Sequence, residues 1–286
     1  MIGNTDTELI KEMNEEEIKG YINFLFNTYN KRKKDEILYK ENDEFPKIII
    51  KLYYEAIERI GMEKIFDSFK NNYLNIDEKG IDNENKLEEV HTKEERLGLY
   101  EVYNSIQEDK IPLEQIGIYS LSMLHQKLYS LAPHPEYSGS FRTDPARLKN
   151  AAIELYPPES IPSAVNNLNQ TVYKIVSDSK EIIERNDYSK ILTYIDNCVK
   201  LHCKLIEIHP FRDGNGRTTR ALMNALFKLA GIPPVYVKPE EKKEYHQAME
   251  NAIVNNNYNE IFTFFRYKIC DSIIALDLSM QKEKTI

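Results

Sequence analysis

The stretch Ile208-His-Pro-Phe-Arg-Asp-Gly-Asn-Gly-Arg-Thr-Thr-Arg220 joins two segments whose apolar residues recur at helical spacing. Pro210 ends the first segment, and Gly214 and Gly216 permit positive φ and a close backbone approach. Amide groups at the start of the second segment can therefore point inward, and such a helix N-terminus attracts anions. The stretch predicts a helix, an anion-binding loop and a second helix.

Charged side chains in this stretch indicate polyphosphate chemistry. Arg217 and Arg220 share one face of the second helix, where both guanidinium groups can bind phosphate oxygens. Asp213 lies in the same loop, and a carboxylate beside bound phosphates typically holds Mg²⁺. His209 can act as a base on an incoming hydroxyl group. Each feature alone is common in loops and exposed helices, but their combination favours a functional site.

Most of the remaining sequence also has helical periodicity. Only 10 glycines and 12 prolines occur in 286 residues, and apolar side chains recur at helical spacing. One such stripe consists of Leu192, Ile195, Val199, His202 and Ile206. We therefore predict a mainly α-helical protein.

Two further segments suggest how the chain is organised. Residues 21–69 have the pattern of amphipathic helices, interrupted once near Pro46, and residues 72–95 are polar and acidic, which is typical of a domain boundary. Residues 146–156 are the one stretch that could form a short β-hairpin, because they lie between helical regions and end at two prolines. Such a flap could present backbone groups to an extended target segment, although an ordinary surface loop fits nearly as well.

Composition argues against several classes of protein. The 46 acidic and 38 basic side chains give a net charge of -8, so sequence-independent binding to nucleic-acid phosphates is not expected. No segment approaches the roughly 20 apolar residues of a membrane-spanning helix. Residues 1–11 are polar and acidic, unlike a secretory signal, and Cys198, Cys203 and Cys270 lack a disulfide or zinc spacing. We expect a cytoplasmic protein without membrane or nucleic-acid partners.

The stretch from Ile208 to Arg220 resembles the signature of the Fic family, His-x-Phe-x-Asp/Glu-Gly-Asn-Gly/Lys-Arg-x-x-Arg. Every fixed position is filled, by His209, Phe211, Asp213, Gly214, Asn215, Gly216, Arg217 and Arg220. The resemblance extends over about residues 112–270 and includes Gly139-Ser-Phe-Arg142 and Tyr245. It implies an all-α, Fic-type helical bundle with a small β-hairpin flap. The implied divisions are an N-terminal helical region (1–100), a Fic-like domain (101–275) and a C-terminal tail (276–286).

The resemblance also implies a reaction, the transfer of AMP from ATP to Ser, Thr or Tyr of a target protein with release of pyrophosphate. The implied roles are His209 as base, Asp213 as Mg²⁺ ligand, Gly214, Asn215 and Gly216 as anion hole, Arg217 and Arg220 as phosphate ligands, Phe211 as core anchor, and Tyr245 near the nucleotide base. Electrostatic positioning dominates such phosphoryl chemistry. The implied partners are ATP and an unidentified target protein, and a homo-oligomer is a further possibility.

The sequence also allows other reactions at this site, and it does not decide whether an internal Glu inhibits the site. The same site could remove AMP from a modified protein, or transfer a phosphate or another nucleotide-linked group. A silent helical adaptor is disfavoured, because a structural loop needs neither Asp213 nor both arginines. Many members of the family carry an inhibitory Glu that pairs with the second arginine, here Arg220. Two incomplete matches, Glu84 and Glu283, are the candidates for that role.

Overall fold

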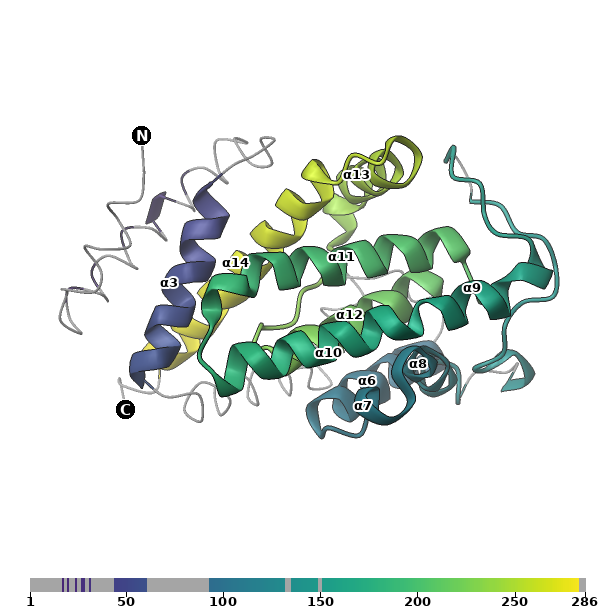
Figure 1. Ribbon diagram of the computed structural model, residues 1–286, viewed down its shortest axis with the longest axis horizontal. Coiled ribbons are helices and arrows are strands. Elements are labelled where there is room, and N and C mark those ends of the chain that lie inside the picture. Colours follow the sequence, from purple (N-terminus) through teal and green to yellow (C-terminus); the bar gives the residue numbers. More distant parts are fainter. Residues whose placement is uncertain are drawn as a thin grey trace.

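The computed structural model describes residues 17, 20, 24, 27, 28, 31, 44–60, 93–131, 135–148 and 151–282 (Figure 1). Its α-helices are α3 (Phe45–Ile60), α6 (Lys93–Gln107), α7 (Leu113–Ile116), α8 (Ser120–Leu128), α9 (Ile161–Asn167), α10 (Asn169–Glu184), α11 (Ile191–Ile208), α12 (Asn215–Leu229), α13 (Lys242–Asn255) and α14 (Asn259–Lys282). Short 3₁₀ turns are η1 (Gly117–Tyr119), η2 (Pro135–Tyr137), η3 (Pro158–Ser160), η4 (Tyr188–Lys190) and η5 (Pro239–Glu241). These residues contain no strand, so the predicted helical fold class is confirmed.

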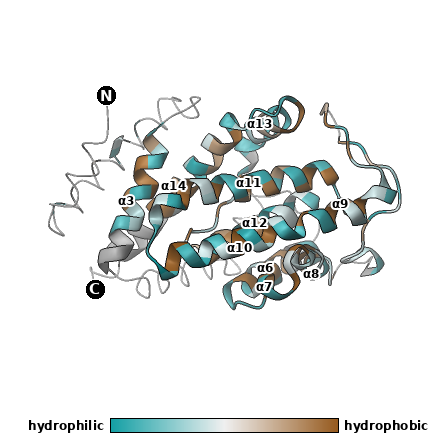
Figure 2. Cartoon of the chain, viewed as in Figure 1, coloured by the Kyte–Doolittle hydropathy of each residue, from teal (hydrophilic) through white to brown (hydrophobic). Residues whose placement is uncertain are grey.

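Helix α11 is the central element and packs against α10, α12, α13 and α14. Its predicted apolar stripe faces the core, where Ile195, Val199 and His202 are fully or almost fully buried. Hydrophobic and hydrophilic residues alternate along each of these helices, as expected when one face is buried (Figure 2). Each fully buried Ile or Val stabilises the fold by about 1.5–3 kcal/mol. Burial of this stripe therefore fixes the helix that leads into the signature loop.

Helix α3 joins the N-terminal region to this core. It begins beside Pro46, where the sequence predicts an interruption, and proline is compatible with the first turn of a helix. The buried hydroxyl groups of Tyr53 and Tyr54 donate to the carbonyls of Gly231 and Ala230, at 2.9 and 2.7 Å. Helix α3 also packs along α14. Helices α3 and α6, which both begin within residues 1–100, thus share the main core, and the division at residue 100 stays a prediction.

Helix α6 approaches α8 closely because Gly98 has no side chain. A methyl group at this position would lie 2.0 Å from the carbonyl oxygen of Leu128, which no residue other than glycine can avoid. The close contact places Glu95, about one turn earlier on α6, against α12 and the signature loop.

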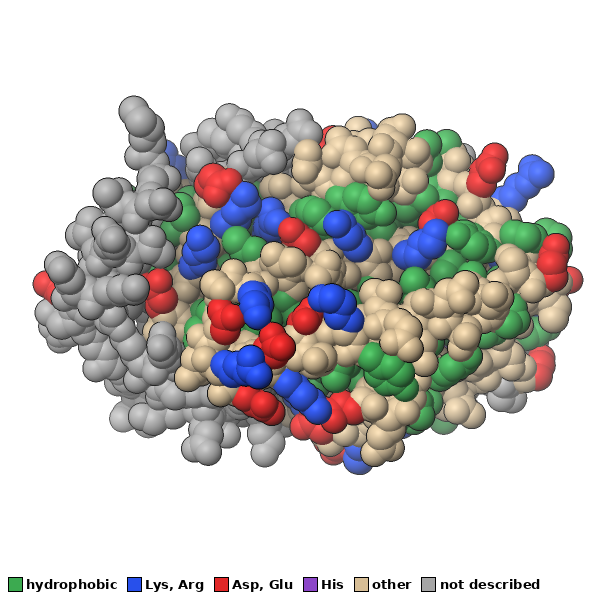
Figure 3. Space-filling view, viewed as in Figure 1, with side chains coloured by type: hydrophobic (Ala, Val, Ile, Leu, Met, Phe, Trp, Pro, Cys, Tyr) green, Lys and Arg blue, Asp and Glu red, His purple; other side chains and the backbone are tan. Residues whose placement is uncertain are grey.

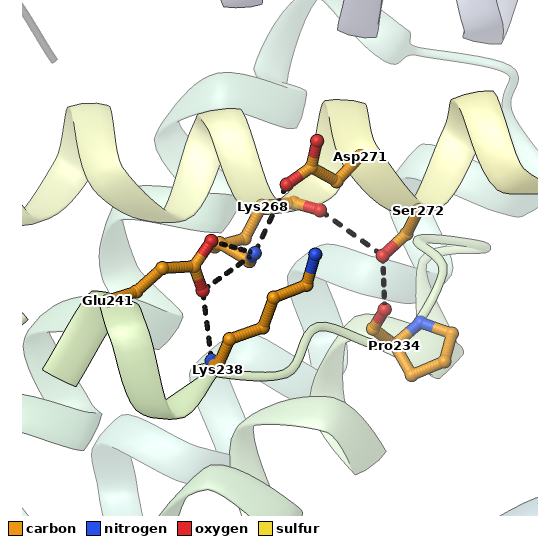
Figure 4. A network of polar contacts seen from close by, with 6 residues as sticks. All are labelled: Pro234, Lys238, Glu241, Lys268, Asp271 and Ser272. Carbon is orange, nitrogen blue, oxygen red and sulfur yellow. Dashed lines mark hydrogen bonds and ion pairs between the residues drawn. The ribbon is translucent and has the colours of Figure 1, made fainter. Parts of the chain in front are cut away.

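A polar network fixes α13 against α14 (Figure 4). The ammonium group of Lys268 is 3% exposed and donates to both carboxylate oxygens of Glu241, at 2.8 and 2.9 Å, and to Asp271 at 3.1 Å. Glu241 also accepts the backbone N–H of Lys238. The buried charge is compensated by two carboxylates, as a buried ammonium group requires. The network therefore holds the start of α13, the helix that carries Tyr245.

The described part of the predicted hairpin, residues 146–148 and 151–156, contains no strand. The N–H of Ala152 donates to the carboxylate of Glu250 on α13, and the N–H of Tyr156 donates to the carbonyl of Glu207 on α11. A hairpin needs two strands that bond to each other, whereas this segment bonds to two helices. The described residues thus show no strand pair where the sequence predicts one.

The surface on the side of α10 and α11 carries charges of both signs. Lysine and arginine side chains lie among aspartate and glutamate side chains in this view and do not form one basic field (Figure 3). Ion pairs near the surface include Lys174 with Asp178 and Lys190 with Glu181. Such pairs contribute little to stability. In the part of the chain that the structure describes, no helix has the length and apolar character needed to cross a membrane.

Candidate active site

The signature loop begins where α11 ends. His209 caps α11 in the left-handed conformation, with φ 51° and ψ 61°, and its N–H donates to the carbonyl of Leu205. Pro210 follows and cannot continue the helix. A left-handed backbone is unusual for a residue other than glycine and often marks a functional site. The conformation turns the chain sharply and points the loop toward the start of α12.

The other end of the loop is closed by Asn215 and Gly214. The Asn215 side chain accepts the N–H of Phe211 at 2.9 Å and donates to the carbonyl of the same residue at 2.7 Å. Gly214 has φ 69°, and a methyl group there would lie 2.6 Å from the ring of Tyr129. Both glycine properties, positive φ and small size, are therefore required. The amides of residues 215–217 open the N-terminus of α12, where a helix has no internal acceptors for them.

The imidazole of His209 is neutral and is held through Nδ1. Its Nδ1 atom lies 3.4 Å from the carbonyl oxygen of Ile206, and a carbonyl can only accept, so Nδ1 carries the proton. The lone pair is therefore on Nε2. Burial lowers the pKa of His209 to about 4, and the positive charge of Arg142 acts in the same direction. The imidazole is neutral at pH 7, the form that can accept a proton.

His125 supports the loop from α8. Its ring stacks on Phe211, with centroids 3.8 Å apart and planes at 13°. Its Nδ1 atom accepts the N–H of Gly139 at 2.9 Å, so Nε2 carries the proton and donates to the carbonyl of Asp213 at 3.1 Å. Phe211 is fully buried, as the expected core anchor should be. His125 therefore fixes the middle of the loop from two sides.

Arg217 is turned toward α6 and α8. Its Nη1 atom donates to the carboxylate of Glu95 at 3.0 Å, and its Nη2 atom donates to the hydroxyl of Tyr129 at 2.9 Å. The carboxylate of Asp213 lies 3.7 Å away. Both Arg217 and Glu95 have side chains that are no more than 10% exposed. Glu95 therefore compensates the buried charge of Arg217, and phosphate oxygens would have to compete with Glu95 for the guanidinium group of Arg217.

Arg220, one turn later, faces α13 instead. Its Nη1 atom lies 3.5 Å from the hydroxyl of Tyr245, and its guanidinium carbon lies 5.6 Å from the centre of the same ring. The hydroxyl of Tyr245 is also 2.7 Å from Nε2 of His202. Burial lowers the pKa of His202 to about 3, so this histidine is neutral. Tyr245, which is 3% exposed, thus connects Arg220 to the core through its hydroxyl group.

Asp213 is the residue that fits a magnesium ion. Its side chain is 66% exposed, and one carboxylate oxygen accepts the N–H of Gly214 at 2.7 Å. Among the described residues, no group of three or more His, Cys, Asp or Glu side chains could hold a metal by itself. A single carboxylate beside phosphate oxygens suits Mg²⁺, which needs only one or two protein ligands. The buried thiols of Cys198 and Cys203 have raised pKa values because they are desolvated, which disfavours metal binding there.

Residues 112–227, which contain this loop, match the Fic/DOC family. This match covers less than half of the chain. The chain is 29% identical over 174 residues to protein adenylyltransferase Fic of Nematostella vectensis, covering 60% of this chain and 36% of that protein. It is 39% identical over 82 residues to the enzyme of the same name from Drosophila willistoni, covering 29% of this chain and 16% of that protein. The chain thus spans about a third or less of the length of these curated relatives.

Solved structures support the fold. Fic-1 (aa134–508) from C. elegans superimposes with a TM-score of 0.54 at 17% identity, covering 99% of this chain and 79% of that one. A variant of the same protein with one substitution gives a TM-score of 0.50 at 21% identity, covering 66% of this chain and 52% of that one. At this level of identity the likeness concerns the Fic fold alone.

Several residues that contact the signature loop could not be identified from the sequence. Glu95 lies in the polar stretch expected to be solvated, His125 lies on α8, and Tyr129 directly follows that helix. Their partners are distant in sequence, so no spacing rule connects them to the loop. The candidate inhibitory residues Glu84 and Glu283 lie outside the described residues.

Proposed function

We propose that this chain is a protein adenylyltransferase, which transfers AMP from ATP to a Ser, Thr or Tyr hydroxyl of a target protein. The observation that carries the proposal is the neutral His209, with its lone pair on Nε2, placed at the turn that leads to the N-terminus of α12. The names of the curated relatives agree with this activity. The thiols of Cys198, Cys203 and Cys270, all free and buried, fit the expected cytoplasmic location.

In the proposed reaction, the target hydroxyl oxygen attacks the α-phosphorus of ATP. A new P–O bond forms, the bond between the α-phosphorus and the bridging oxygen breaks, and pyrophosphate leaves. Nε2 of His209 accepts the hydroxyl proton, which makes the attacking oxygen a better nucleophile. General-base assistance of this kind typically contributes about 10²- to 10⁴-fold in rate.

The nucleotide phosphates would lie at the N-terminus of α12. The amides of Asn215 and Gly216 and the positive end of the helix dipole would stabilise their charge. Arg220 would bind the phosphates from one side. Arg217 would do so only by exchanging its contact with Glu95 for phosphate oxygens, which makes Glu95 a competitor inside the site. Asp213 would hold Mg²⁺, which supplies positive charge to the phosphates when bound.

The target segment would bind beside the described residues 143–148 and 151–156. This part of the chain begins at the signature loop, where the N–H of Arg142 donates to the carbonyl of Pro210, and returns to α11 at Tyr156. A hollow of about 280 Å³ next to it is lined by residues that include Tyr137, Phe141 and Arg212. An extended peptide could pair with backbone groups here, as the flap hypothesis requires.

The test is a labelling experiment. The protein is incubated with Mg²⁺, a host lysate and ATP, GTP, UTP or CTP labelled at the α-phosphate, and modified residues are identified by mass spectrometry. We expect labelling from ATP by the wild type, loss of at least about 10²-fold with His209→Ala, and no change with His246→Ala, which alters an exposed histidine.

Two results would contradict the proposal. Equal labelling by wild type and His209→Ala would remove His209 as the base. Release of AMP from a previously modified protein, with no labelling from any nucleotide, would assign the reverse reaction to this site.

A further inference from the structure

The guanidinium group of Arg142 is buried against the end of α11, and this arginine is only 6% exposed. Its Nε atom donates to the carbonyl of His209 at 2.7 Å, and Nη2 lies 3.5 Å from the carbonyl of Ile208. Its backbone N–H donates to the carbonyl of Pro210 at 2.8 Å. Three successive carbonyls of the turn that carries the base are therefore held by one residue, 67 positions earlier in the sequence than His209.

The same side chain also binds the segment beside the site. Its Nη1 atom donates to the backbone carbonyl of Asp144 at 2.8 Å, and Nη2 donates to the backbone carbonyl of Tyr156 at 2.5 Å. These two carbonyls lie near the two ends of residues 143–156. Arg142 thus connects both ends of this segment to the turn at His209. The position of the turn therefore depends on the position of the segment.

This arrangement answers two physical needs of the turn. The last carbonyls of a helix have no internal partners, and the C-terminal end of the helix dipole favours a positive charge. His209 also occupies a left-handed conformation that residues with a side chain rarely adopt, so it needs support from its surroundings. A planar guanidinium with five donors can bind several carbonyls at once, which a lysine ammonium group cannot do in the same geometry.

We propose that Arg142 is a positioning residue of this site, which fixes the imidazole of His209 for proton removal and aligns it with the backbone at Asp144 and Tyr156. The inference rests on the proposed function. Arg142 does not touch the phosphate-binding residues in any of these contacts, so its effect should fall on the chemical step and spare nucleotide binding. A displacement of about 1 Å at a reacting group can lower a rate by about 10²-fold.

The experiment compares Arg142→Gln and Arg142→Lys with wild type. We expect kcat for AMP transfer to fall by about 10²-fold in Arg142→Gln, and by less in Arg142→Lys, while the Kd for ATP stays within about twofold. Arg185→Gln, which alters an exposed arginine at the C-terminal end of α10, is the matched control and should leave both constants unchanged. Thermal unfolding and the ATP-binding stoichiometry measure the folded fraction of each variant.

A second readout does not depend on activity. The ring nitrogen signals of His209 in an NMR spectrum report its tautomer and mobility, and we expect Arg142→Gln to broaden or shift them while Arg185→Gln does not. Wild type without any transfer activity would refute the proposed function, and the NMR comparison would still test the role of Arg142. An unchanged kcat in folded Arg142→Gln, an equal fall in kcat and ATP affinity, or unchanged His209 signals would each overturn the inference.

Discussion

The carboxylate of Glu95 lies 3.0 Å from the guanidinium of Arg217, and both side chains are almost completely buried. Helix α6 therefore supplies the charge partner of the first signature arginine. Removal of one charge from a buried pair leaves the other uncompensated, which costs far more than the net contribution of the pair.

Glu95→Gln should therefore destabilise the protein. The amide keeps a hydrogen-bond acceptor but loses the charge, so we expect the free energy of unfolding to fall by about 1–3 kcal/mol. Urea denaturation at pH 7 measures this change. Glu94→Gln alters the exposed neighbour on the same helix and should have almost no effect. A similar loss in both variants would mean that the contact with Arg217 is not what stabilises α6.

Tyr245→Phe removes the hydroxyl group between Arg220 and His202. Because Arg220 loses a contact that orients it, we expect weaker phosphate binding and a Kd for ATP that rises by about 2- to 10-fold. Isothermal titration with a non-hydrolysable ATP analogue measures the change. Tyr258→Phe, at the turn between α13 and α14, is the control. An unchanged Kd in Tyr245→Phe would show that this hydroxyl does not support nucleotide binding.

Asp213→Asn should weaken the response to Mg²⁺. The amide can still accept the N–H of Gly214, so the loop geometry is kept while the negative charge is lost. We expect the Mg²⁺ concentration for half-maximal transfer to rise by at least about 10-fold. Glu184→Gln changes an exposed carboxylate at the end of α10 and should leave the titration unchanged. A wild-type Mg²⁺ curve for Asp213→Asn would exclude this carboxylate as the ligand.

Stability should decrease as the pH falls below about 6.5. Burial lowers the pKa of His202 from its ordinary value of 6.5 to about 3, so between these values the unfolded chain binds a proton that the folded chain does not. This histidine alone should remove about 2 kcal/mol between pH 7 and pH 5. Urea denaturation at both pH values should show a smaller loss for His202→Gln than for wild type. His246→Gln, at an exposed position, should retain the wild-type difference.

The loop and its nearest helices could be predicted from local sequence. Pro210 and the glycines that follow determine where one helix ends and the next begins, because backbone conformation at these positions depends on the residue type itself. The stripe on α11 predicts a buried face for a similar local reason, since side chains three or four positions apart lie on one side of a helix. The strand pair expected at residues 146–156 does not appear among the described residues. Prolines and other turn-forming residues beside a segment indicate where it ends, but they do not determine which groups its backbone bonds to.

Local sequence thus predicts the helical class and the loop between α11 and α12, both of which the structure has, whereas the anion-binding and reactive roles of the loop residues stay predictions. Tertiary structure decided which side chains support them: Glu95 pairs with Arg217 across 122 positions, and Arg142 holds the carbonyl of His209 across 67. It also separated the two signature arginines, turning Arg217 toward α6 and Arg220 toward α13. The physical reason is that local propensities act over a few residues, whereas these contacts arise only when packing of a shared core brings distant helices together.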